Sequence, residues 1–115
     1  MAKTERAPRL VWVYPDGGRE PIGKRRFEVE WQELTASAKK RHKLPDYDHD
    51  RDRDEVSVVR HFDTKEAARA FARKTVDAYK TVYGSATVEE QVLEVSDLRD
   101  GVGEWAEVGE VEYVD

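Results

Sequence analysis

The sequence contains no cysteine among its 115 residues. Disulfide bonds, thiol nucleophiles, zinc ribbons and Fe–S clusters are therefore excluded together. The absence of cysteine also agrees with a protein that works in a reducing compartment, and we expect a cytoplasmic location. The length is close to the commonest size of a single domain, and two separate cores would be hard to build from it. We predict one domain over residues 1–115.

Long apolar runs are absent as well. The longest covers residues 10–14, whereas a membrane-spanning helix needs about 20 consecutive apolar residues. Residues 1–9 include basic side chains, but no apolar stretch of signal-peptide length follows them. We expect neither a membrane span nor secretion by a standard signal.

The patterns of common catalytic and metal sites are missing too. No serine stands in a Gly-x-Ser-x-Gly elbow, and no glycine-rich segment leads into Lys-Ser or Lys-Thr. Aspartate alternates from Asp46 to Asp54, as at the start of an EF-hand loop, but no register supplies the glycine and glutamate that the loop needs. His49-Asp50 is a dipeptide of metal-dependent phosphohydrolases, yet the chain has only three histidines. We predict no enzyme activity, no metal and no cofactor.

Charge is the most abundant feature of the chain. Charged residues make up 39% of it and apolar residues 38%, a balance that approaches disordered proteins. Three Trp, five Tyr and three Phe, grouped with Val and Leu, favour an ordered fold. Residues 46–55 hold one aromatic and no aliphatic side chain. We therefore expect residues 35–54 to form an exposed charged loop, with a short helical turn over 36–43.

Three segments within the first 62 residues have the character of strands. Residues 9–14 are β-branched and aromatic and end at a Pro-Asp-Gly-Gly turn signal. Phe27, Val29 and Trp31 alternate with two glutamates, which is typical of a half-buried antiparallel strand. We expect these two segments to pair as a hairpin, and residues 55–62 to form a third strand.

One helix follows, because apolar residues recur at helical spacing between residues 67 and 83. Asp63 with Glu66 three residues later predicts a capping box at its start, and Gly84 is placed to end it. Residues 86–98 favour a strand, and a second helix capped at Thr87 is the alternative.

The last strand is expected over residues 105–114, after a turn at 100–103, with a bulge at Gly109. The element order is then β-β-β-α-β-β. This order predicts an α+β fold: a mostly antiparallel sheet of about five strands with one amphipathic helix packed on one face.

The acids and bases are distributed unevenly. Residues 84–115 contain ten acids and one base, Arg99. We predict that this segment forms an acidic surface for a protein partner with a basic surface. Trp105 or Tyr113 would be an aromatic anchor if exposed. The partner-binding residues would be Glu89, Glu90, Glu94, Asp97, Asp100, Glu104, Trp105, Glu107, Glu110 and Glu112. Small, cysteine-free, charge-polarised domains of this kind are typical of phage and mobile-element inhibitors, including anti-CRISPR proteins, and our first hypothesis is a non-enzymatic binding module of that type.

Two basic clusters flank the strand at residues 27–31 and support an alternative. Basic side chains beside aromatic ones can hold a phosphate backbone and stack bases. The alternative is a nucleic-acid-binding accessory protein that uses Lys24, Arg25, Arg26, Lys39, Lys40, Arg41 and Lys43. A third hypothesis is a homo-oligomer that pairs through an edge strand.

Overall fold

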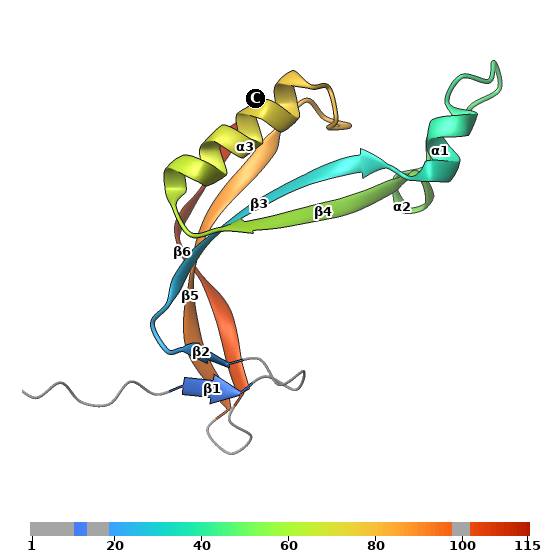
Figure 1. Ribbon diagram of the computed structural model, residues 1–115. Coiled ribbons are helices and arrows are strands. Elements are labelled where there is room, and N and C mark those ends of the chain that lie inside the picture. Colours follow the sequence, from blue (N-terminus) through green and yellow to red (C-terminus); the bar gives the residue numbers. More distant parts are fainter. Residues whose placement is uncertain (1–10, 14–18, 98–101) are drawn as a thin grey trace, which may run out of the picture. The chain divides into compact units, whose positions relative to one another are not determined.

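The fold is α+β, with an antiparallel sheet of four strands, a separate pair of short strands and three short helices within the described residues (Figure 1). The computed structural model describes residues 11–13, 19–97 and 102–115. Contacts group the chain into two compact units, which we name the first unit (residues 1–25 and 91–108) and the second unit (residues 26–90 and 109–115). A single domain over the whole chain stays a prediction.

The main sheet has the strand order β4 (Glu55–Phe62), β3 (Arg25–Leu34), β5 (Ala86–Asp97) and β6 (Val102–Val114). The expected pairing of residues 9–14 with 27–31 is wrong. β1 (Val11–Val13) pairs with β2 (Arg19–Pro21) in a sheet of their own. Pairing with a partner a few residues away costs less loop-closure entropy than pairing with residues 27–31, which favours the local pair. The single five-stranded sheet is therefore replaced by sheets of four and two strands.

Three of the later predictions agree with the structure. β4 covers the predicted residues 55–62, and β5 confirms a strand over residues 86–97 in place of a second helix. β6 includes the whole of residues 105–114. Gly109 within it has φ +73°, the left-handed conformation that glycine bulges use.

The register of β3 and β4 decides which side chains share a face. Phe27 lies opposite Phe62, Val29 opposite Arg60, and Trp31 opposite Val58. Directly opposed residues of an antiparallel pair point to the same side. This face therefore carries most of the apolar residues of the two strands, as the alternation of residues 27–31 predicts.

Helix α3 (Lys65–Asp77) covers that face with its small residues. Ala68 and Ala72 are fully buried against Val29 and Trp31, and Phe71 packs beside them. Both predicted ends are wrong. The N-cap is Thr64, whose hydroxyl accepts from the Ala67 N–H at 3.2 Å, and the helix stops at Asp77, well before Gly84. No helix in the described ranges is long and apolar enough to cross a membrane.

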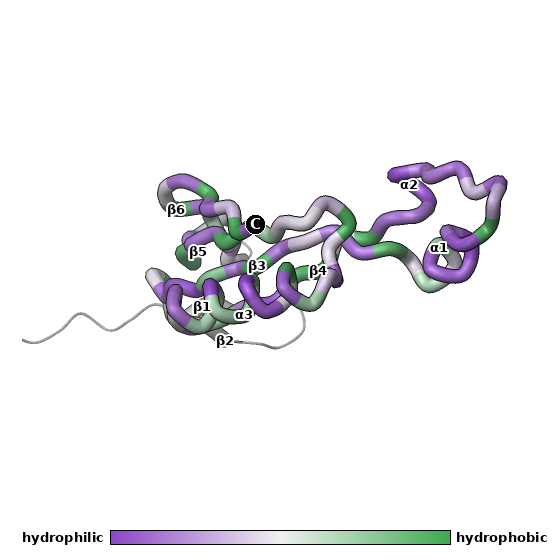
Figure 2. Tube along the Cα trace, turned by 90° about the horizontal axis from the view of Figure 1, so that it is seen from above, coloured by the Kyte–Doolittle hydropathy of each residue, from purple (hydrophilic) through white to green (hydrophobic). Residues whose placement is uncertain are grey.

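Residues 35–54 lie between β3 and β4 and contain two short helices, α1 (Ala36–Arg41) and α2 (Arg51–Asp54). Figure 1 shows both at the tip of the hairpin that β3 and β4 form, and Figure 2 shows this segment as largely hydrophilic. Most of its side chains are exposed, in line with a charged surface segment. It is nevertheless anchored, because the Thr35 N–H donates to the Asp54 carbonyl at 2.8 Å and the Asp54 side chain is fully buried.

Candidate functional site

A hollow of about 900 Å³ opens on the second unit, lined by β3, β4, α1 and the end of α3. Its floor is apolar and aromatic. Trp31 is 6% exposed, and its ring centroid lies 5.6 Å from that of Phe71, which in turn lies 5.1 Å from Phe62. Val58 completes the floor from β4. The volume lies in the upper part of the range of small-molecule sites.

The rim of the hollow is basic. Four cationic side chains reach it, Lys39, Arg60, Lys74 and Lys80, against one carboxylate, Glu33. Glu33 is already engaged: it accepts from the Trp31 indole N–H at 2.9 Å and lies 3.8 Å from the Lys39 ammonium. Within the part of the chain that the structure describes, the other three cations are exposed and form no ion pair. Their positive potential is thus available to an anion that enters the hollow.

Tyr79 lines the hollow two residues after the end of α3. The Tyr79 N–H donates to the Val76 carbonyl at 3.0 Å and the Lys80 N–H to the Thr75 carbonyl at 3.3 Å, the two bonds of a Schellman motif. This motif puts its C′ residue in the left-handed region, where glycine is usual, and Tyr79 has φ 56°. The side chain is 94% exposed. A bulky aromatic residue therefore occupies a strained backbone position without packing on the core.

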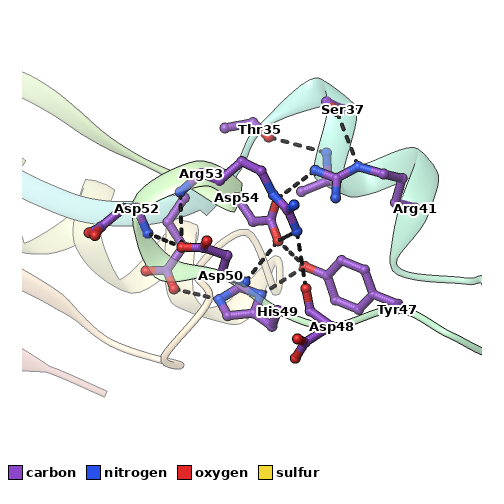
Figure 3. Close-up of polar contacts among 12 residues, drawn as sticks. Thr35, Ser37, Arg41, Tyr47, Asp48, His49, Asp50, Asp52, Arg53 and Asp54 are labelled. Atoms are coloured by element: carbon purple, nitrogen blue, oxygen red, sulfur yellow. Dashed lines mark hydrogen bonds and ion pairs between the residues drawn. The ribbon is translucent and has the colours of Figure 1, made fainter.

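A buried ion cluster lies in the segment of residues 35–54, and Tyr47, which contacts it, lines the hollow. The carboxylate of Asp54, at 0% exposure, contacts Arg41 Nη2 at 2.5 Å and Arg53 Nε at 3.1 Å (Figure 3). It also accepts from the Asp50 N–H at 2.9 Å and from the Tyr47 hydroxyl at 3.2 Å. The Arg53 and Asp50 bonds are the main reason that the pKa of Asp54 lies far below its ordinary value.

A chain of polar contacts links Tyr47 to Tyr83 through His49 and Glu55. Tyr47 Oη lies 2.8 Å from His49 Nδ1, and His49 Nε2 lies 2.6 Å from Glu55 Oε2, which also accepts from the Tyr83 hydroxyl at 2.8 Å. The Glu55 side chain is 2% exposed, and its Oε1 has no partner among the described residues. The His49 bond is the largest cause of a lowered pKa at Glu55. Tyr47 and His49 line the hollow, so this chain positions part of its surface.

The connectivity of Tyr47, His49 and Glu55 is that of a nucleophile, a base and an orienting carboxylate. The protonation of Tyr47 argues against that use. Partial burial, followed by the hydrogen bond to Asp54, raises the pKa of the Tyr47 phenol above its ordinary value. A nucleophile needs a lowered pKa or a base that takes its proton. The one hydroxyl proton of Tyr47 is donated to Asp54 at 3.2 Å, which leaves none for His49 to accept. The arrangement therefore favours a positioning role for the phenol.

Of the predicted nucleic-acid-binding residues, only Lys39 lines the hollow. Arg41 forms an ion pair with Asp54. Lys40 and Lys43 are exposed on the segment of residues 35–54 and do not line the hollow. Each of the residues Lys24, Arg25 and Arg26 interacts with another group of the protein. Sequence reasoning missed four rim residues: Arg60, Lys74, Tyr79 and Lys80. The three bases among them are spread over 21 residues: Arg60 and Lys80 are isolated, and Lys74 follows Arg73 on the predicted helix, so no run of bases groups them.

The predicted acidic set is divided between the two units. In the first unit Glu94, Glu104 and Glu107 are exposed, and Trp105 is half-buried and has a contact with another group. Asp100 and the side chain of Asp97 lie outside the described residues.

In the second unit Glu110 is exposed, as is Tyr113 at 72%. Glu112 forms an ion pair with Arg69 Nε of α3 at 2.9 Å, so its charge is matched. Glu89 and Glu90 are half-buried and interact with other groups. The structure thus leaves four of the ten predicted partner-binding residues as exposed carboxylates without an ion pair to a described residue: Glu94, Glu104, Glu107 and Glu110.

Among residues 11–13, 19–97 and 102–115, no group of three or more His, Asp or Glu side chains is placed to hold a metal ion. No protein-family model, curated protein or solved structure matches this chain. The chemistry of the site therefore rests on its own residues.

Proposed function

We propose that this protein is a non-enzymatic, cytoplasmic nucleic-acid-binding module whose binding surface is the basic hollow of the second unit. One observation carries the proposal: Arg60, Lys74 and Lys80 surround an aromatic floor without an ion pair to any described residue. A phosphate backbone supplies closely spaced negative charges, and cations that neutralise it release counterions, which favours binding.

The local charge of the hollow outweighs the net charge of −5 on the whole chain. Interactions between exposed charges are largely screened beyond about 8–10 Å at physiological ionic strength. A strand lying in the hollow responds mainly to the rim cations. The acids of the β5–β6 region act on it only where they fall within that distance.

Reversing the rim charges tests this function. The triple variant Arg60→Glu, Lys74→Glu and Lys80→Glu should bind a labelled oligonucleotide at least about tenfold more weakly than the wild type in a fluorescence-anisotropy titration. The slope of log K against log salt should also become shallower by about 2, because each lost phosphate contact on a single strand removes about 0.7.

A matched variant changes the net charge equally at exposed lysines that do not line the hollow: Lys40→Glu, Lys43→Glu and Lys65→Glu. It should keep most of the affinity and most of the salt slope. Equal losses in the two triple variants would show that the hollow is not the binding surface, and no binding by the wild type would refute the function itself.

The acidic set supports a second candidate function, a protein-binding inhibitor of the phage or mobile-element type, anti-CRISPR proteins included. The supporting observation is that Glu94, Glu104 and Glu107 of the first unit are exposed and lack an ion pair to a described residue. Unpaired carboxylates on one hairpin would steer a basic protein partner toward the complex.

This candidate is tested by reversing the three carboxylates to lysine. A protein partner captured from lysate should survive nuclease treatment and be lost from the Glu94→Lys, Glu104→Lys and Glu107→Lys variant. It should be retained by a control with Asp46, Asp48 and Asp63 reversed to lysine, all three exposed. Capture that disappears with nuclease would instead favour the nucleic-acid function.

A further inference from the structure

Tyr79 is the most exposed of the large hydrophobic side chains that the structure describes, at 94%, and it stands in a backbone conformation that disfavours it. The Schellman motif at the end of α3 needs a left-handed residue at this position, and the Cβ of any residue other than glycine adds strain there. The fold gains no packing in return, because almost the whole ring is in solvent. Retained strain of this kind is a pointer to function.

The surroundings of Tyr79 suggest what the ring can contact. Tyr79 lines the hollow together with Lys74 and Lys80. Lys74 lies three residues before the end of α3, and Lys80 directly follows Tyr79. An exposed aromatic ring that lines the same hollow as two cations offers a π-face near positive charge. Surfaces that bind single-stranded nucleic acid combine these two features: aromatic rings stack the bases, and basic groups track the phosphates.

We propose that the hollow receives single-stranded nucleic acid, with one base stacked on the ring of Tyr79 and the adjacent phosphates held by Arg60, Lys74 and Lys80. The inference rests on the proposed nucleic-acid function and names its substrate class. A duplex keeps its bases stacked on one another and presents phosphates outward, so it cannot offer a free base to Tyr79. An acidic peptide would satisfy the cations but would leave the exposed ring without a planar partner.

The test uses the full-length protein and three labelled probes: a single-stranded oligothymidine of about 12 nucleotides, a duplex of the same length, and a single strand of that length with abasic sites in place of the bases. Tyr79→Ala should bind the single strand roughly 5- to 150-fold more weakly than the wild type, the range measured for loss of one stacked base. Tyr79→Phe keeps the ring and should bind like the wild type.

The abasic strand separates stacking from phosphate contacts. Wild type and Tyr79→Ala should bind it with equal affinity, since it offers no base to stack, while the Arg60, Lys74 and Lys80 charge-reversal variant should bind it more weakly. If Tyr79→Ala binds the oligothymidine as the wild type does, or if duplex binds as tightly as single strand, the stacking inference is wrong while the nucleic-acid function stands. If none of the three probes binds, both are wrong.

Discussion

Arg41 and Asp54 form an ion pair of 2.5 Å, although they are 13 positions apart in the sequence. The pair joins the last residue of α1 to the last residue of α2 and buries the carboxylate completely. A buried carboxylate is tolerated only where hydrogen bonds and opposite charges replace its water. Asp54 has both, since Arg53, Tyr47 and the Asp50 N–H also contact it. This cluster gives an otherwise hydrophilic segment a fixed structure.

Replacing Asp54 by Asn should loosen residues 35–54 and lower the denaturant midpoint of the protein. The amide keeps the size of the side chain but leaves the two guanidinium groups without a counter-charge. Hydrogen exchange should rise at the Asp54 and Thr35 amides, whose backbone bonds tie the segment together. Asp46→Asn, at an exposed position, should leave both measurements unchanged. Unaltered exchange in Asp54→Asn would contradict the anchoring role.

The same cluster predicts a loss of stability in acid. The bonds from Arg53, Asp50 and Arg41 hold the pKa of Asp54 well below the value of about 3.9 that an unfolded chain has. A carboxyl with a lowered pKa stabilises the fold above its unfolded pKa and loses that contribution as the pH falls toward the folded one. Urea titrations should therefore show the stability gap between wild type and Asp54→Asn narrowing as the pH falls from about 5 toward about 2. A gap independent of pH would exclude this origin.

Tyr79→Gly should stabilise the fold by about 1 kcal/mol, because glycine adopts φ near +56° without the Cβ clash. The gain is reduced by the larger entropy of glycine in the unfolded chain. Thermal or urea unfolding measures the change. Tyr113→Gly is the matched control, since Tyr113 is also exposed but lies in β6, where glycine should destabilise. A destabilised Tyr79→Gly would show that the ring contributes to packing after all.

Phe71→Ala should destabilise the protein by about 3 kcal/mol. Phe71 is half-buried, and its ring contacts both Trp31 and Phe62, so truncation leaves a cavity under α3. Phe71→Leu keeps most of the volume and should cost less. Equal costs for the two variants in urea unfolding would indicate that α3 shifts to fill the space.

Local patterns in the sequence predicted much of the fold. The alternation of Phe27, Val29 and Trp31 identified β3 and its apolar face, and the β-branched residues after Gly84 identified β5. The end of α3 was missed because Tyr79 occupies the position where glycine is usual, and the glycine at 84 was taken for the cap instead. Burial of Asp54 was missed because nothing in a run of alternating acids and bases marks one carboxylate as the centre of a cluster.

Residue spacing and composition were enough to predict the periods of the strands and of the helix, the α+β class, and the exclusion of cysteine chemistry. These depend on side-chain spacing along a few turns or pleats, which neighbouring residues encode. Three features became visible only in the folded chain: β1 pairs with β2, Asp54 is buried, and Arg60, Lys74 and Lys80 line one hollow. Contacts between residues far apart in the sequence depend on strand register and on the residue at which a helix ends. Packing of the whole chain determines both.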